Sequence, residues 1–144
     1  MYQTKLRTII VTSVFLFDFI MANHLYIQDL GVITPYDDSE IAWVLPTFVK
    51  TGEPFDVTVK TFGDTCVAAR RLDVEIQDFD LILRPIDVLK LHGSCFSIGN
   101  TYPRTVQLNL NDVGVYTVFL EGYKRNLFNE KELIRLKRFL IVIK

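Results

Sequence analysis

Cys66 and Cys95 are the residues whose chemistry is most easily defined, because a pair of thiols can form a disulfide, hold a metal or react. They are the only cysteines of the chain, and no Cys-x-x-Cys motif supports thioredoxin-like redox chemistry. We therefore predict a structural disulfide between the loop after one strand and the loop before another. Closing a loop of this size contributes about 3–4 kcal/mol if the bond acts through chain entropy.

His92 lies three residues before Cys95 and could supply half of a zinc site. A structural zinc needs four ligands, and the other histidine, His24, is far away in the sequence. Ser94 and Ser97 are too close to His92 for a usual hydrolase site, in which the partners come from separate elements. We expect no metal, no cofactor and no catalytic residue. A small hydrolase with its site in the loops around His92 is the alternative.

Three other groups of side chains could bind a ligand, but each has an ordinary structural explanation. The acidic residues of segment 73–80 suit a solvated strand face, with weak calcium binding as an alternative. Tyr102, Tyr116 and Tyr123 could form a surface patch, for example for carbohydrate, or pack at strand ends. The basic residues of segment 124–138 alternate with glutamates, which favours a mixed-charge surface over a polyanion site.

The N-terminus has the features of an export signal. Lys5 and Arg7 precede an apolar run, Thr8–Phe17, that is shorter than a membrane span of about 20 residues. Asp18 interrupts the run, so we expect no stable membrane insertion of the mature chain. We predict that residues 1–22 are a signal peptide and that the protein is secreted or periplasmic, where disulfides form. The alternative is a cytosolic interaction domain with free thiols and a packed N-terminus.

Composition limits the remaining classes. The chain has 144 residues, which suits one domain, and its hydrophobic content of 49% allows a sizeable core. Its 16 basic and 17 acidic residues give a net charge of −1. Such a surface has no long-range attraction for nucleic acid, so we expect no nucleic-acid partner.

Alternating residues predict strands from about residue 40 onward. Phe55, Val57 and Val59 alternate with polar residues and should face the core. Asp78-Phe79 should form the turn of a first hairpin that Pro85 ends. The expected core partners of the first strand are Val106, Leu108, Leu110 and Phe119.

The second half of the chain is expected to add a second hairpin and a final strand. Segment 111–114 should form the turn between segments 106–110 and 115–120, the latter covered on both faces. Segment 126–138 fits either a helix or a strand, and we favour a strand from about Lys137.

The predicted fold class is all-β, an Ig-like antiparallel β-sandwich of about seven strands. We expect this domain to span residues 40–144, after an N-terminal arm or loosely attached strand at residues 23–39. The antibody pattern is missing, because Trp43 precedes both cysteines instead of lying between them.

Several segments of the chain, taken in order over most of residues 40–122, resemble a family of small, uncharacterised exported bacterial proteins with an Ig-like β-sandwich. The segments are Gly52-Glu53-Pro54-Phe55-Asp56-Val57-Thr58-Val59, Gly63-Asp64-Thr65-Cys66, Leu83-Arg84-Pro85-Ile86-Asp87, Cys95, Tyr102-Pro103-Arg104-Thr105-Val106-Gln107-Leu108 and Gly114-Val115-Tyr116-Thr117-Val118. The resemblance implies an exported sandwich in which Cys66 and Cys95 are a recurring pair, and it implies no activity. We therefore expect an exported structural or binding module without catalytic activity, whose partner is a protein or a carbohydrate.

Overall fold

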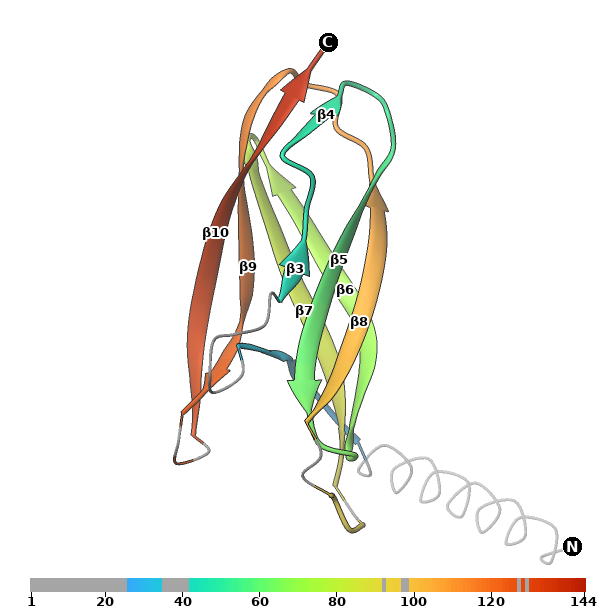
Figure 1. Cartoon of the computed structure of the whole chain (residues 1–144), viewed down its shortest axis with the longest axis vertical. Helices are drawn as coiled ribbons and strands as arrows, with labels where there is room; N and C mark the ends of the chain where they lie inside the picture. Colours follow the sequence, from blue (N-terminus) through green and yellow to red (C-terminus); the bar gives the residue numbers. More distant parts are fainter. Residues whose placement is uncertain (1–25, 35–41, 92, 97–98, 127, 129) are drawn as a thin grey trace, which may run out of the picture.

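The computed structural model describes residues 26–34, 42–91, 93–96, 99–126, 128 and 130–144, and this part of the chain forms ten β-strands and no helix (Figure 1). The predicted all-β class is therefore confirmed. The strands are β1 (Tyr26–Leu30), β2 (Val32–Thr34), β3 (Trp43–Val44), β4 (Phe48–Lys50), β5 (Phe55–Gly63), β6 (Val67–Gln77), β7 (Asp80–Lys90), β8 (Asn100–Leu108), β9 (Gly114–Arg125) and β10 (Lys131–Ile143).

The strands form one hydrogen-bonded sheet that folds over into two layers. One layer contains β6, β7, β9 and β10, and the other contains β3, β5 and β8. Most pairings are antiparallel, but β7 with β9, β2 with β9 and β4 with β10 are parallel. The largest fully buried side chains of the core between the layers include Ile33, Val57, Val59, Leu81, Leu83, Tyr116, Val118, Leu120 and Leu140.

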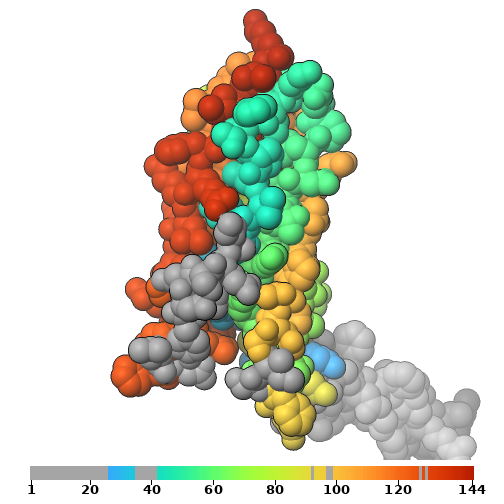
Figure 2. Space-filling view, in the orientation of Figure 1, coloured from blue at the N-terminus to red at the C-terminus, as the bar shows by residue number. Residues whose placement is uncertain are grey.

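The short strands β3 and β4 close one side of the molecule. β3 pairs with β5 in one layer, and a few residues later β4 pairs with the end of β10 in the other. Figure 2 shows this segment, in teal, on the surface between β10 and β5. The ring of the buried Trp43 fills the space beneath, where the Arg138 guanidinium lies 5.1 Å from its centroid.

The first hairpin is confirmed, but Pro85 does not end it. Gln77 pairs with Asp80 across a two-residue turn in which Asp78 has φ of 53°, a value that such turns require and aspartate tolerates. β7 continues through Pro85 to Lys90. Its neighbour changes there, from β9 to β1, and the Pro85 carbonyl accepts a hydrogen bond from the Gly31 amide. Proline has no backbone N–H, but at this change of neighbour its absence removes no hydrogen bond between paired strands.

The predicted second hairpin is wrong. β8 pairs with β5, whereas β9 pairs with β7 and β10 in the opposite layer. Segment 109–113 is therefore a connection between layers. The alternation of β8 fits a place beside β5, where Val106 pairs with Val57 and Leu108 with Phe55.

The strands at the two ends of the described chain extend beyond the predicted ones. β10 is a continuous strand of 13 residues along β9, so most of segment 126–138 is strand, beginning earlier than Lys137. β1 and β2 belong to the sheet, and Ile33 is part of the core, so segment 26–34 is more than an arm. The predicted signal peptide, residues 1–22, lies outside the described residues.

Candidate functional site

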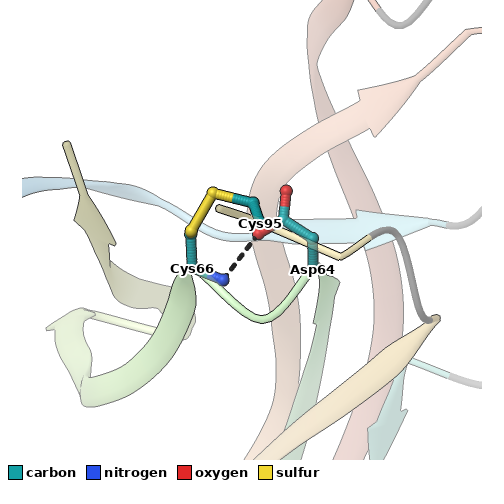
Figure 3. A group of neighbouring side chains, drawn as sticks. All are labelled: Asp64, Cys66 and Cys95. Atoms are coloured by element: carbon teal, nitrogen blue, oxygen red, sulfur yellow. Dashed lines mark hydrogen bonds between the residues drawn. A yellow bond between two sulfur atoms is a disulfide. The ribbon is translucent and has the colours of Figure 1, made fainter. Parts of the chain in front are cut away.

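The disulfide between Cys66 and Cys95 lies at one end of the molecule, with the two Cα atoms 5.3 Å apart (Figure 3). It joins the turn between β5 and β6 to the loop before β8. Asp64 shapes this turn, because its Oδ1 accepts a hydrogen bond from the Cys66 amide at 2.9 Å. Its carbonyl accepts one from the Tyr102 hydroxyl at 2.6 Å. The bond therefore holds together two loops that already share polar contacts.

These groups do not form a metal site in the oxidised protein. Ligand atoms of Asp64, Cys66 and Cys95 lie within 4.8 Å of one another, but the two sulfurs are bonded to each other. A zinc ion needs thiolates, which this bond removes. His92 and Ser97, which belong to the alternative hydrolase prediction, lie outside the described residues. The disulfide between Cys66 and Cys95 is therefore the chemical feature that the structure defines at this end of the molecule.

Replacing both Cys66 and Cys95 with alanine should lower the free energy of unfolding by about 2–4 kcal/mol, because the unfolded chain regains the freedom of the closed loop. Denaturant unfolding measures this loss, and Ser94→Ala, an exposed position in the same loop, is the control with no expected change. Thiol labelling of the oxidised wild type in denaturant would contradict the prediction.

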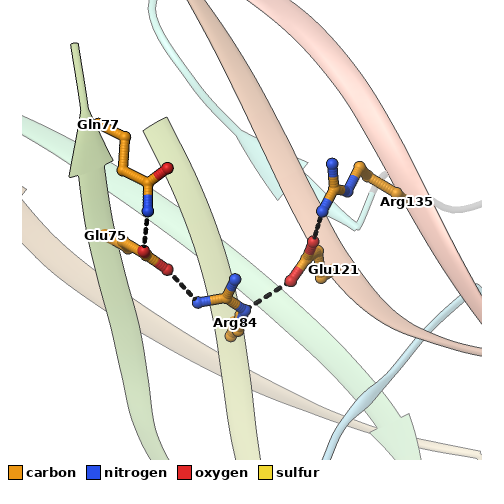
Figure 4. Close-up of polar contacts among 5 residues, drawn as sticks. All are labelled: Glu75, Gln77, Arg84, Glu121 and Arg135. Carbon is orange, nitrogen blue, oxygen red and sulfur yellow. Dashed lines mark hydrogen bonds and ion pairs between the residues drawn. The ribbon is translucent and has the colours of Figure 1, made fainter. Parts of the chain in front are cut away.

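A row of alternating charges crosses the outer face of the layer formed by β6, β7, β9 and β10 (Figure 4). Arg84 Nη1 contacts Glu75 Oε2 at 2.6 Å, and its Nε contacts Glu121 Oε2 at 2.5 Å. Arg135 pairs with the other oxygen of Glu121. The predicted acidic run is thus on a solvated face, as expected, and two of its carboxylates, Asp73 and Glu75, pair with arginines.

Glu121 is the most enclosed carboxylate of this row. Its partial burial raises the pKa, but the hydrogen bonds from Arg84 and Arg135 and their charges outweigh burial and leave the pKa below its usual value. The ionised form therefore stabilises the folded state at pH values above the unfolded pKa of about 4.3, and this contribution is lost as pH falls through the folded pKa.

The free energy of unfolding of the wild type should consequently fall more steeply in acid than that of Glu121→Gln. The difference between the two proteins is expected to be largest near neutral pH and to shrink below about pH 4. Denaturant unfolding at a series of pH values measures it. A difference that stays constant from pH 7 to pH 3 would show that Glu121 carries no lowered pKa.

A second polar cluster lies inside the molecule and joins the layers. Asp87 of β7 pairs with Arg104 of β8, and their side chains are 5% and 8% exposed. Arg104 Nη2 also donates to the Thr61 hydroxyl, which donates to Asp87 Oδ1, both at 3.0 Å. Gly31 lies so close to the cluster that a Cβ added to it would overlap with Thr61 Cγ2.

The charges of this buried cluster are incompletely compensated. Burial raises the pKa of Asp87, although the charge of Arg104 and the bonds from Thr61 and Arg104 act in the opposite direction. Arg104 Nε and Nη1 are buried and have no hydrogen-bond partner among the described residues. Both charged side chains are more than nine-tenths buried, so the cluster is best understood as an internal polar contact between the layers.

Several exposed apolar side chains gather on the outer side of β4, β10 and β9. The register places Phe48, Ile141 and Val115 side by side across these strands. Phe139 and Ile143 flank Ile141 on the same side of β10. We call Phe48, Val115, Phe139, Ile141 and Ile143 the outer patch; their exposed fractions are 66%, 57%, 57%, 42% and 42%.

The outer patch is not among the sequence-based predictions, although the alternation that forms it is present in the sequence. Phe139–Ile143 is predicted as part of a final strand, and its alternate members Leu140 and Val142 are buried. The three tyrosines that had been candidates for a surface do not gather. Tyr116 is buried in the core, and Tyr102 and Tyr123 are half-buried on different strands.

Comparison with protein-family models, with curated proteins and with solved structures finds no match to this chain. The cysteine pair implied by the family resemblance is present as a disulfide. Within the described residues, no helix is long and apolar enough to cross a membrane. The fold and site therefore define a disulfide-linked β-domain.

Proposed function

We propose that this chain is an exported binding module without catalytic activity, secreted or periplasmic, which binds its partner through the outer patch. The observation that carries the proposal is the contiguous set of exposed apolar side chains on β4, β10 and β9. Exposed apolar side chains gathered on one face are typical of interaction sites, whereas single ones are ordinary.

Two further observations support export and binding. The disulfide is half-exposed at Cys66 and exposed at Cys95, and such bonds persist in oxidising compartments. β10, which carries three of the five residues of the outer patch, is hydrogen-bonded along almost its whole length to β9, so the backbone beneath these side chains is held in place. A preformed surface binds at a lower entropic cost than a flexible one.

Export is tested by the intact mass and N-terminal sequence of protein from an exporting host. We expect loss of residues 1–22 and a mass lower than that of the dithiol by two hydrogen atoms. Met1 or Tyr2 at the N-terminus of the exported protein would refute the signal peptide.

Binding is tested by placing a photo-crosslinking residue at position 139 in the producing cell. We expect discrete adducts from this position and none from position 56, since Asp56 is exposed on β5 in the other layer. Equal patterns from the two positions, or no adduct from position 139, would refute binding through the outer patch.

A further inference from the structure

We infer that the partner of the outer patch is an acidic amphipathic segment of another protein. The inference rests on the proposed function and adds the chemistry of the partner. It starts from the charges that accompany the patch on β4 and β10.

Two lysines beside the outer patch, Lys50 and Lys137, lie on the same side of the sheet as its apolar residues. On this side of β10, Lys137 has no ion pair among the described residues, whereas the charge of Arg135 is already paired with Glu121 of β9. Lys50 follows Phe48 on β4, opposite Ile143. The Lys137 Nζ lies 5.0 Å from the centroid of the Phe139 ring, so charge and apolar surface are adjacent. A complementary ligand therefore needs apolar side chains next to carboxylates.

A second copy of this chain fits the patch poorly. Two copies stacked face to face would bring the Lys50 and Lys137 side chains of both copies into the same interface. The only described ion pair of these lysines is the exposed contact between Lys50 and Glu53, at 3.7 Å, which compensates little. Like charges at an interface oppose association, so charge favours a different, acidic partner.

An anionic membrane surface fits poorly for another reason. On the outer face of the same layer, Asp73 and Glu75 are paired with Arg71 and Arg84, but Asp80 of β7 is exposed and has no ion pair among the described residues. A flat bilayer would bring the Asp80 carboxylate against its own negative headgroups. β4, β10 and β9 together span about 10 Å, the width of one helix or of a pair of strands. A single protein segment can cover the patch and leave the acidic side of the face free.

The test uses two synthetic peptides of equal length with leucines at the same positions, one with glutamates and the other with lysines between them. Titration calorimetry with the exported, oxidised protein should show that the glutamate peptide binds at least about tenfold more tightly. Higher salt should weaken this binding, because solvent-exposed charges are screened.

Variants connect the preference to the patch. Lys50→Glu with Lys137→Glu should abolish the preference for the glutamate peptide, and Phe139→Ser should weaken both peptides. Lys60→Glu, on β5 in the other layer, is the matched control and should behave as wild type. Unchanged denaturation midpoints confirm that each variant is folded.

Several results would overturn the inference. These are equal binding of the two peptides, no binding of either, or binding only to phosphatidylglycerol vesicles. A concentration-dependent dimer that Phe139→Ser abolishes would also overturn it. Any of these together with site-specific adducts from position 139 would leave the binding module intact and refute only the acidic partner. Failure of the crosslinking would refute both.

Discussion

Asp87→Ala should lower the free energy of unfolding by about 3–5 kcal/mol, because it leaves the Arg104 guanidinium buried without a carboxylate. In the wild type, two buried guanidinium nitrogens of Arg104, Nε and Nη1, already lack a hydrogen-bond partner among the described residues, so losing Asp87 would leave this cation still less compensated. Thr61 would lose the acceptor of its hydroxyl in the same variant. Denaturant unfolding near neutral pH measures the loss.

A double variant separates the charge from the packing. Burial raises the pKa of Asp87, so the ionised pair contributes little net stability even though breaking it is costly. Asp87→Leu combined with Arg104→Met should therefore be clearly more stable than Asp87→Ala alone. Asp80→Ala, an exposed carboxylate on the same strand, should change stability by less than about 0.5 kcal/mol. A double variant as unstable as the single one would mean that packing, not the unpaired charge, dominates.

The two charged members of this cluster, Asp87 and Arg104, follow the same alternation as the core residues of their strands. Leu81, Leu83 and Asp87 share one parity along β7, and Arg104 shares the inner parity of its strand. The expectation that Pro85 ends the strand leaves Asp87 outside this alternation. The proline is tolerated only because the neighbouring strand changes at that point, which is a long-range property.

Alternation predicted which face of β5 is buried, and Val57 and Val59 are fully buried as expected. It did not predict which strand pairs with which. The turn residues at Asn111–Gly114 suit a hairpin, yet β8 and β9 separate into different layers. Local turn chemistry is compatible with both arrangements, and only the fit of β8 beside β5 decides between them. The outer patch cannot be predicted from alternation alone, because it forms only where β4 and β9 lie beside β10.

A difference between Leu120→Ala and Phe119→Ala follows from the register of β9. Phe119 was predicted to face the core, but the inner residues of this strand are Tyr116, Val118 and Leu120. Phe119 is half-buried on the outer face, where the Arg135 guanidinium lies 4.9 Å from the ring centroid. The smaller of the two side chains is therefore the one that fills the core.

Leu120→Ala should lower the free energy of unfolding by about 3–5 kcal/mol, through lost transfer energy and the cavity left between the layers. Phe119→Ala removes more atoms but opens no cavity, and it should cost about 1–1.5 kcal/mol through lost contact with Arg135 and neighbouring strands. Denaturation midpoints of the two variants measure the contrast. A Phe119→Ala variant as unstable as Leu120→Ala would mean that β9 is shifted by one residue, and such a shift would turn Glu121 into the core. In the observed register Glu121 lies on the outer face, where it pairs with Arg84 and Arg135, whereas the shifted register would bury its carboxylate away from both partners.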